Sequence, residues 1–532
     1  MILTKEQKRA IQDINNNSAI VACPGSGKTT ILINKMILCS RDLKNYNGFI
    51  ALSFTKKSSY ELKLRFKRKS NSMNNNFFGT IDDFFANEII RPFLSNVWGG
   101  NSKDLEIIKV LNDDESLNFV DDPSKKKLNL NDIEADSGFK GLFRDGKILI
   151  NSINALALLV IKKSNSCRRY LKSRYKYIFI DEYQDTSYDQ HLVFLEILDL
   201  KLVSTIVGDI NQSIYKWNNA SPEYLLSLVR DNGFKEYKIS KNHRCHPSIN
   251  NYANVFLGIS DEILEGDKKI YKLILNDESK SRYKKLDKLI GNIIKKFDFN
   301  NNEVAIISRL NSAIESYSKQ TELSHKIYLD DPLDKIGCKA STICTDLLNY
   351  KFSKKISIYE IYNKNSIIRN SISLNKFREI FKSDDNDEFL ENIRCLFGFL
   401  SLNIDIEPAL AATNTILKDD KYIKMYMPDD INDIQMLNIH KSKGLEFKVV
   451  IHIGLEALSF PLVTKNDGIW GIKDMKEEKN LHFVAITRAE KLCFLISMTK
   501  RVNSNLVEID AEPSEFFTYP YLEDHIKDLG QR

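Results

Sequence analysis

The chain has 532 residues, 42% of them hydrophobic, and its 77 Lys and Arg against 71 Asp and Glu give a formal net charge of +6. This length predicts two or more domains, and the small positive charge permits nucleic-acid binding without requiring it. The eight cysteines form no CxxC pair, the N-terminus becomes charged too early for a signal peptide, and no apolar run has membrane-spanning length, so we expect a cytoplasmic protein with neither a disulfide framework nor a zinc ribbon.

The N-terminus predicts a short amphipathic helix. Thr4 is its expected N-cap, and Gln7 follows three residues later, the spacing of a capping box. Gln7 therefore has two interpretations. Its side chain can complete the capping box, or its amide can read the adenine edge of a nucleotide, because one amide both donates and accepts hydrogen bonds.

The stretch VACPGSGKTTIL at residues 21–32 predicts a strand, a phosphate-binding loop and a helix. Backbone N–H groups of such a loop point at phosphate oxygens, the positive end of the helix faces the anion, Lys28 reaches the outer phosphates, and the Thr29 hydroxyl can ligate Mg2+. Ala22 stands where the usual pattern begins with Gly, and this small residue still permits the turn. We therefore predict a nucleotide site at Pro24, Gly25, Ser26, Gly27, Lys28, Thr29 and Thr30.

The next segment, FIALSFTKKSSYELKLRF, predicts a buried strand from Phe49 to Phe54 followed by a helix. An αβ repeat of this kind indicates a parallel sheet with functional loops at the strand ends, where Phe54 and Thr55 lie. The basic run at residues 63–69 has two interpretations, a solvated helix face or a contact with the phosphate backbone of a nucleic acid. A second basic cluster lies at residues 168–176.

Two carboxylates follow an apolar strand in YIFIDEYQDTSYDQ, residues 177–190. A buried parallel strand delivers such groups to the sheet edge. Asp181 can hold the Mg2+ shell, and Glu182 can orient or deprotonate the attacking water.

The segment TIVGDINQSIYKWNNA, residues 205–220, repeats the pattern of a strand followed by polar residues. Gln212 can sense the γ-phosphate of a nucleotide. Tyr215 and Trp217 offer flat faces on which bases can stack, although aromatics at this spacing also occur in cores and on sheet faces.

Arg244 follows a short strand in KISKNHRCHPSI. Its neighbours His243, Cys245 and His246 do not predict a metal site, because three residues this close in sequence cannot converge tetrahedrally and no fourth ligand is near.

A second αβ layer begins with VAIISR at residues 304–309 and resumes with MLNIHKSKGLEFKVVIHIGL at residues 436–455. His440, Ser442 and Lys443 can meet a backbone phosphate, and Glu446 can accept a hydrogen bond from a ribose hydroxyl. Arg488 lies in a later helix, where it is either a surface cation or an arginine finger that reaches a nucleotide on the other domain.

Taken in order, these segments resemble superfamily 1 helicases of the UvrD and Rep type over nearly the entire chain. The resemblance implies an α/β fold with two RecA-like parallel-sheet domains, 1A and 2A, ATP and Mg2+ in the cleft between them, and a mainly helical insertion in each. The implied ranges are 1–86 and 173–245 for domain 1A, 87–172 for insertion 1B, 246–310 and 431–532 for domain 2A, and 311–430 for a reduced insertion 2B.

The resemblance also assigns roles to individual residues. Hydrolysis is assigned to Asp181, Glu182, Gln212, Arg244 and Arg488. Nucleotide contacts are assigned to Gln7, to the loop residues Pro24, Gly25, Ser26, Gly27, Lys28, Thr29 and Thr30, and to His243, Gly444 and Glu446. The metal ligands are Thr29 and Asp181. Single-stranded DNA is assigned to Phe54, Thr55, Thr80, Tyr215, Trp217 and His440, and the implied direction of translocation is 3′ to 5′.

Three positions depart from the family pattern. His243 replaces the tyrosine that stacks on adenine, Asn218 replaces an arginine in WNNA, and Asp82 replaces a histidine that meets DNA in GTIDD. A carboxylate beside a phosphate is unfavourable, so we expect weak unwinding.

The short length and the segment FGTIDDFFANEIIRPF at residues 78–93 resemble, more narrowly, the helicase-like subunit of Gabija anti-phage systems. That resemblance implies a partner, an OLD-type nuclease with a Toprim domain, and activation by DNA ends. The alternatives are a stand-alone repair helicase and a nucleotide-gated docking subunit with little unwinding.

Overall fold

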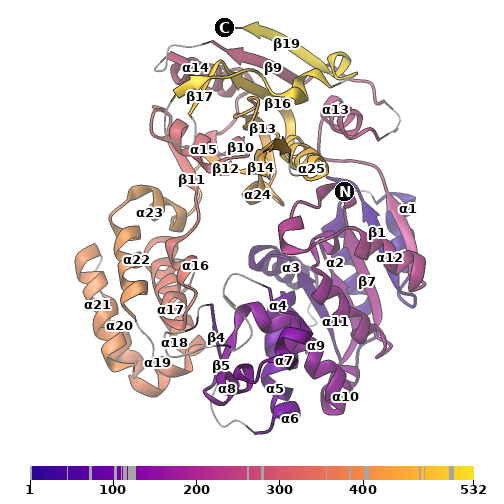
Figure 1. The fold of residues 1–532 in the computed structure, drawn as a ribbon, viewed down its shortest axis with the longest axis vertical. Coiled ribbons are helices and arrows are strands. Elements are labelled where there is room, and N and C mark those ends of the chain that lie inside the picture. The colour runs from indigo at the N-terminus through magenta and orange to yellow at the C-terminus, as the bar shows by residue number, and fades with distance from the viewer. Residues whose placement is uncertain are drawn as a thin grey trace.

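Two separate all-parallel sheets organise the protein in the computed structural model (Figure 1). The structure describes residues 3–44, 46–70, 75–100, 105–109, 111, 117, 127–259, 263–276, 281–354, 356–382, 385–400, 406–466, 469–472, 474–502, 508–519 and 521–531. The predicted α/β fold class is confirmed. Much of the polar stretch 101–136, which the sequence analysis assigns to the first insertion, lies outside the described residues.

The first sheet has six strands in the order β3-β2-β6-β7-β1-β8. Their bounds are β1 Ser18–Ala22, β2 Gly48–Ser53, β3 Phe77–Thr80, β6 Tyr175–Ile180, β7 Val203–Gly208 and β8 Lys235–Ile239. All six residues of β2 are buried, as expected for a parallel strand that is covered on both faces. The covering helices are α1 Lys5–Gln12, α2 Lys28–Ser40, α3 Lys56–Lys69, α11 Tyr188–Leu198 and α12 Glu223–Asp231.

The first insertion shares its core with the first sheet. It comprises α4 Ile81–Phe84, a π-helical turn Phe85–Ile90, α5 Arg91–Phe93, α6 Ser95–Trp98, β4 Glu106–Ile108, α7 Leu130–Ala135, α8 Gly138–Arg144, β5 Lys147–Leu149, α9 Ile153–Lys163 and α10 Asn165–Arg174. Residues 153–161 of α9 are all buried, and the apolar ones pack in one cluster with Ile50 and Ile178 of the sheet. The insertion is therefore anchored to the first sheet by apolar packing.

The second sheet has seven strands in the order β11-β12-β10-β13-β16-β9-β19. Their bounds are β9 Ile270–Leu275, β10 Val304–Ser308, β11 His325–Tyr328, β12 Ile434–Asn438, β13 Phe447–His452, β16 Ala489–Met498 and β19 Ile526–Gln531. The associated helices are α13 Pro247–Leu257, α14 Ser281–Phe297, α15 Asn311–Ser318, α24 Ile439–Ser442 and α25 Met475–Ile486. Two antiparallel pairs, β14 Val463–Asn466 with β15 Ile469–Ile472 and β17 Lys500–Val502 with β18 Glu508–Asp510, complete this unit.

The second insertion is a helical layer with its own core. Its helices are α16 Pro332–Ile336, α17 Lys339–Leu348, α18 Ile358–Lys364, α19 Ser366–Ser371, α20 Leu374–Ile380, α21 Asn386–Phe399, α22 Glu407–Leu417 and α23 Asp420–Tyr426, with a π-helical turn Asn349–Ser353 after α17. The expected start at residue 311 is wrong, because α15 packs on the second sheet and β11 pairs with β12 in parallel register. The other expected boundaries stay predictions.

The two insertions touch each other. Lys109, which follows β4, donates through its ammonium to the backbone carbonyl of Asp334 in α16, and α17 contacts β4. In Figure 1 the orange helices of the second insertion therefore lie beside the purple elements of the first. Within the described residues, no helix combines the length and apolar composition that crossing a bilayer requires.

Candidate functional site

The loop between β1 and α2 has a backbone shaped for an anion. Gly25 and Gly27 adopt positive φ angles of +67° and +78°, and Gly27 occupies the N-cap of α2 without a side chain. A Cβ atom on Gly25 would lie 2.3 Å from the side-chain oxygen of Asn242, so this position excludes larger residues. Within the described part of the chain, the N–H groups of Lys28 and Thr29 in the first helical turn have no acceptor. They are available to phosphate oxygens.

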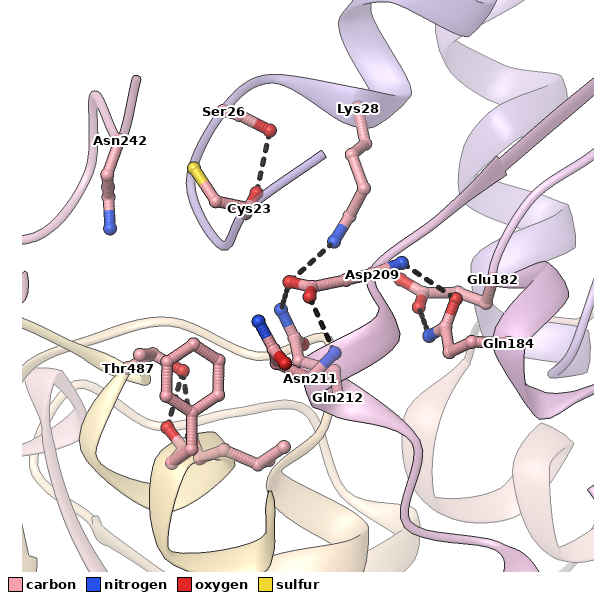
Figure 2. Close-up of polar contacts among 12 residues, drawn as sticks. Cys23, Ser26, Lys28, Glu182, Gln184, Asp209, Asn211, Gln212, Asn242 and Thr487 are labelled. Atoms are coloured by element: carbon pink, nitrogen blue, oxygen red, sulfur yellow. Dashed lines mark hydrogen bonds and ion pairs between the residues drawn. The ribbon is translucent and has the colours of Figure 1, made fainter. Parts of the chain in front are cut away.

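Lys28 points from the start of α2 toward the carboxylates at the edge of the first sheet (Figure 2). Its ammonium lies 3.5 Å from a carboxylate oxygen of Asp209, which directly follows β7. Burial favours a lower pKa for Lys28, but Asp209, Glu182 and Asp181 outweigh it and raise the pKa. Lys28 therefore stays a cation inside the site.

Asp181 and Glu182 follow β6 and are buried together. Glu182 adopts a left-handed backbone conformation with φ 55°, and its N–H donates to the Asp181 carboxylate at 3.0 Å. The amide of Gln184 donates to Glu182 at 2.5 Å and fixes its side chain. Burial and the charge of Glu182 raise the pKa of Asp181, whereas Lys28 and Lys443 lower the pKa of Glu182 against the effect of burial. Glu182 is the ionised member of the pair at neutral pH.

Gln212 connects the two units of the protein, which are the first sheet with its helices and the second sheet with its helices. Its amide nitrogen donates to Asp209 at 2.6 Å, as Figure 2 shows, and its amide oxygen accepts a hydrogen bond from Arg488 at 3.0 Å. Arg488 comes from the turn between α25 and β16 and is only 2% exposed. Burial and the neighbouring Arg244 lower the pKa of Arg488 to about 9, so it remains a cation at neutral pH.

Arg244 crosses between the units in the opposite direction. It follows β8 of the first sheet, and its guanidinium donates to the Glu446 carboxylate at 2.8 Å and to the Thr487 carbonyl at 2.8 Å, both in the second unit. The Arg244 Nε atom is buried without a partner among the described residues. A donor of this kind is free to meet a ligand in the cleft.

These residues line a single cleft, called here the nucleotide cleft, with a volume of about 480 Å³. It is lined by Pro24, Gly25, Ser26, Gly27, Lys28, Thr29, Thr30, Glu182, Gln212, His243, Arg244, Gly444, Glu446 and Arg488. Both units contribute to it. Arg65, Glu490 and Lys491 also line the cleft, and no sequence motif predicts them there.

Two of the expected site residues lie just outside the lining. Asp181 is joined to it through the N–H of Glu182, and Gln7 through its amide, which donates to the Ser26 carbonyl at 2.8 Å. The amide oxygen of Gln7 accepts from the Thr4 N–H and closes the expected capping box. Gln7 is fully buried. Its observed contacts therefore support the loop, and its contact with adenine stays a prediction.

Lys443, expected to meet a backbone phosphate, instead points into the protein. Its ammonium donates to the Asp185 carboxylate and, at 2.6 Å, to the Gln212 carbonyl. Its side chain is only 8% exposed, so the expected contact with a backbone phosphate is not available in this arrangement. Burial raises the pKa of Asp185 to about 7 despite the nearby Lys443. The ion pair joins the loop before β13 to the first sheet.

The donor set fits a magnesium ion. The Asp181 carboxylate and the Thr29 hydroxyl are hard oxygen ligands, which Mg2+ prefers together with phosphate oxygens. Thr29 makes no side-chain hydrogen bond within the described residues and lines the cleft. These two residues would hold the ion, which would neutralise charge on the phosphates.

The aromatic residues assigned to DNA form one cluster across both units. The rings of Phe54 and Tyr215 stack with centroids 4.7 Å apart, Trp217 meets Tyr215 edge-on at 6.0 Å, and His440 of α24 lies 5.9 Å from Tyr215. Trp217 is 71% exposed, which favours the stacking interpretation over a core role. Burial, with Arg309 and Lys443, lowers the pKa of His440 to about 4, so the ring is neutral at neutral pH.

The two threonines assigned to DNA cap helices. Thr55 accepts the Ser58 N–H at the start of α3, and Thr80 accepts the Asp83 N–H at the start of α4. The neighbouring Asp82 accepts a hydrogen bond from Gln190 at 2.9 Å. The protein thus provides a partner for the carboxylate that replaces the family histidine.

The two basic clusters differ. In α10, Arg168 pairs with Glu196, and Arg174 stacks over the Tyr175 ring, so internal contacts occupy much of the cluster. In α3, Arg65 pairs with Glu61, and within the described residues the other cations of this helix make no ion pair or side-chain hydrogen bond. The α3 cluster is therefore the one that is available to a polyanion.

Comparison with known proteins agrees with this geometry. The model of the UvrD/REP helicase N-terminal domain matches residues 3–147 and 145–232, and that of the UvrD-like helicase C-terminal domain matches residues 339–500. Gabija protein GajB of Bacillus cereus (strain VD045) is 28% identical, over 93% of this chain and 95% of that protein. ATP-dependent DNA helicase Rep of Buchnera aphidicola subsp. Acyrthosiphon pisum is 24% identical over 97% and 98%, and PcrA of Staphylococcus epidermidis (strain ATCC 35984) is 22% identical over 94% and 84%.

Proposed function

The chain belongs to the UvrD/Rep family of ATP-dependent DNA helicases, and from that premise we propose that it hydrolyses ATP in the nucleotide cleft to move along single-stranded DNA. One observation carries the proposal: the phosphate loop and Arg488, from different units, line the same cleft. A nucleotide bound there touches both units, so cleavage of its terminal phosphate changes how the units close on each other.

Each polar group has a role in this proposal. The loop N–H groups and Lys28 bind the phosphates, Glu182 orients or deprotonates the attacking water, and Arg244 and Arg488 stabilise the charge on the transferred phosphoryl group. Gln212 senses that group, since its amide already bridges Asp209 and Arg488. Glu446 accepts from the ribose hydroxyl.

DNA is expected to lie across the aromatic cluster of Phe54, Tyr215, Trp217 and His440. Stacking on aromatic faces tolerates any base, as a translocating enzyme requires. Phe54 and Tyr215 belong to the first unit and His440 to the second, so closure of the cleft alters the spacing of the stacking platforms. We propose 3′ to 5′ movement on the family resemblance alone.

The finer proposal is that this chain is the ATPase subunit of a Gabija-type antiviral complex with an OLD/Toprim-type nuclease as its partner. It is supported by the 28% identity to GajB, with nearly full coverage of both chains. The alternatives are a stand-alone repair helicase and a docking subunit with little unwinding. The presence of hydrolytic groups in both units favours an active ATPase over a passive docking subunit.

The ATPase rate tests the function. Hydrolysis should be slow without DNA and rise several-fold with single-stranded or blunt-ended DNA, and the Lys28→Ala variant should show neither rate. A wild-type ATPase rate that is unchanged by every DNA tested would contradict translocation. Co-expression with an OLD-family nuclease tests the finer proposal separately: a stable complex supports it, and separate elution of two folded proteins contradicts it.

A further inference from the structure

A second cavity lies in the second insertion, to which the sequence motifs assign no role. It has a volume of about 590 Å³, similar to the 480 Å³ of the nucleotide cleft. Four segments meet there, which are the π-helical turn after α17, the start of α18, the end of α20 and the start of α21 (Figure 1). Its size is within the roughly 300–1,000 Å³ of small-molecule sites. We call this cavity the insertion pocket.

The floor of the insertion pocket is apolar. Phe381 and Phe389 line it from the core of the insertion, where both are almost fully buried and their rings meet edge-on at 5.6 Å. Tyr350, Ile356 and Ile358 also line the pocket, and they are half-buried against the same core. Aromatic and aliphatic side chains together favour a flat, weakly polar group such as a nucleobase.

The rim of the insertion pocket is cationic. Lys351, Lys354, Arg378 and Lys382 line the pocket, and no acid is among the described residues that do so. Lys354, Arg378 and Lys382 are exposed, and they make no ion pair or side-chain hydrogen bond with any described residue. Lys351 instead lies over the Phe389 ring, with its ammonium 4.8 Å from the centroid. Three positive charges are therefore available to a ligand.

Acids beside the lining in sequence do not neutralise these charges. Glu360 accepts the Ser357 N–H at 2.8 Å, and Asp385 accepts the Glu388 N–H at 2.9 Å, so both carboxylates cap helices. Other cations of the insertion do have acidic partners, namely Lys364 with Asp346 at 2.8 Å and Arg394 with Glu407 at 2.7 Å. Like charges that line one pocket repel each other, and a bound anion removes that repulsion.

An apolar floor under a cationic rim fits a polyphosphorylated nucleotide. The floor can take the base, Arg378 can hold a phosphate through two parallel hydrogen bonds, and the lysines can neutralise the remaining charge. Inorganic polyphosphate has no apolar group to cover the floor. A DNA strand carries one charge per nucleotide, whereas a triphosphate concentrates its charges where the cations of one pocket can meet them.

We propose that the insertion pocket binds a nucleoside triphosphate, as a second nucleotide site that is separate from the nucleotide cleft. Arg378, Lys354 and Lys382 hold the phosphates, and the base lies against the aromatic floor. The described lining offers no carboxylate to Mg2+, which prefers such oxygen ligands. The pocket therefore takes the metal-free nucleotide.

Calorimetric titration with ATP tests the proposal in the Lys28→Ala variant, whose phosphate loop is disabled. This variant should still bind one ATP per chain, and EDTA should not weaken the binding. Adding Arg378→Ala and Lys382→Ala should weaken it about tenfold or more, because charge-assisted hydrogen bonds contribute on that scale. The matched control adds Arg369→Ala and Lys376→Ala, which remove two exposed cations of the same insertion that do not line the pocket. The control should leave ATP binding unchanged.

Three further ligands separate the parts of the site. Adenosine, which has no phosphate, and inorganic triphosphate, which has no base, should each bind about tenfold or more weakly than ATP. A single-stranded oligonucleotide should not displace ATP from the Lys28→Ala variant.

The proposal is overturned if the Lys28→Ala variant binds no ATP, or if removing Arg378 and Lys382 leaves the affinity unchanged. Equal binding of inorganic triphosphate would show a simple anion site, and displacement of ATP by the oligonucleotide would show a site for a DNA strand, so either result would also overturn it. ATP hydrolysis in the nucleotide cleft is measured separately, by the ATPase rate of the chain with Lys28 intact, so the two proposals can fail independently.

Discussion

Arg488 donates through Nη2 to the amide oxygen of Gln212 at 3.0 Å, and this hydrogen bond joins the turn after α25 to the 3-10 turn Ile210–Gln212 that follows β7. Gln212 in turn donates to Asp209, which faces Lys28 of the phosphate loop. A continuous polar chain therefore runs from the second unit to the phosphate site of the first. Closing or opening the cleft must rearrange it.

Arg488→Ala is expected to lower the ATPase kcat by about 10³-fold or more, because an arginine finger contributes on that scale. ATP affinity should change much less, since the phosphate loop is intact. Steady-state kinetics and nucleotide titration measure the two effects. Arg394→Ala, at an exposed pair with Glu407, is the matched control. A normal kcat would assign Arg488 to packing alone.

Glu182→Gln should keep ATP and Mg2+ binding but slow hydrolysis by about 10²-fold or more, the usual contribution of a general base or a group that positions water. Single-turnover hydrolysis after pre-binding ATP separates this effect from binding. Glu360→Gln on α18 serves as the control, because that side chain is exposed. Normal turnover in Glu182→Gln would remove Glu182 from the chemical step.

Trp217→Ala should weaken DNA binding. Removing one stacking platform costs about 1–3 kcal/mol per base, so the DNA concentration for half-maximal ATPase stimulation should rise about tenfold. The melting temperature should hold, since the side chain is 71% exposed. Tyr521→Ala, at a side chain that is 82% exposed, is the control. An unchanged response to DNA would leave Trp217 without a nucleic-acid role.

Lys35 destabilises the first unit at neutral pH. Its ammonium is buried in α2 with the Ser18 hydroxyl as its partner at 2.8 Å, and burial lowers its pKa from 10.5 to about 8. The folded protein therefore binds fewer protons than the unfolded chain between pH 8 and 10.5, so stability rises with pH across that window. The full penalty, about 3 kcal/mol, applies below pH 8.

Lys35→Met should accordingly raise the melting temperature at pH 7, by about 5 °C after allowance for the lost hydrogen bond. The gain should shrink at pH 10. Calorimetry at both pH values measures it, with Lys8→Met on the exposed side of α1 as the control. An equal gain at both pH values would exclude the charge as its cause.

The sequence predicted the fold class and the family because both depend on local patterns. Each of these patterns is recognised from consecutive residues. Examples are the strands followed by Asp181 and Glu182 or by Asp209, and the loop with glycines at 25 and 27. The short strand β11 was missed because its residues, HKIY, alternate too briefly to stand out from the helical segments around it.

Contacts between distant segments could not be predicted in the same way. Arg65 lines the nucleotide cleft from the middle of a basic helix, where nothing in sequence separates it from its neighbours. Lys443 pairs with Asp185, a partner 258 residues away. The sequence around Trp217 fits both a core and a surface position, and only its exposure favours the surface interpretation.

The most direct test of the central claim is a double-mutant cycle on the DNA-stimulated ATPase kcat with Glu182→Gln and Arg488→Ala. If both residues act on one terminal phosphate, the account predicts that the double variant is no slower than the slower single variant, because groups that act as one unit are not additive. Losses that multiply would show independent actions and would contradict a nucleotide held jointly by the two units.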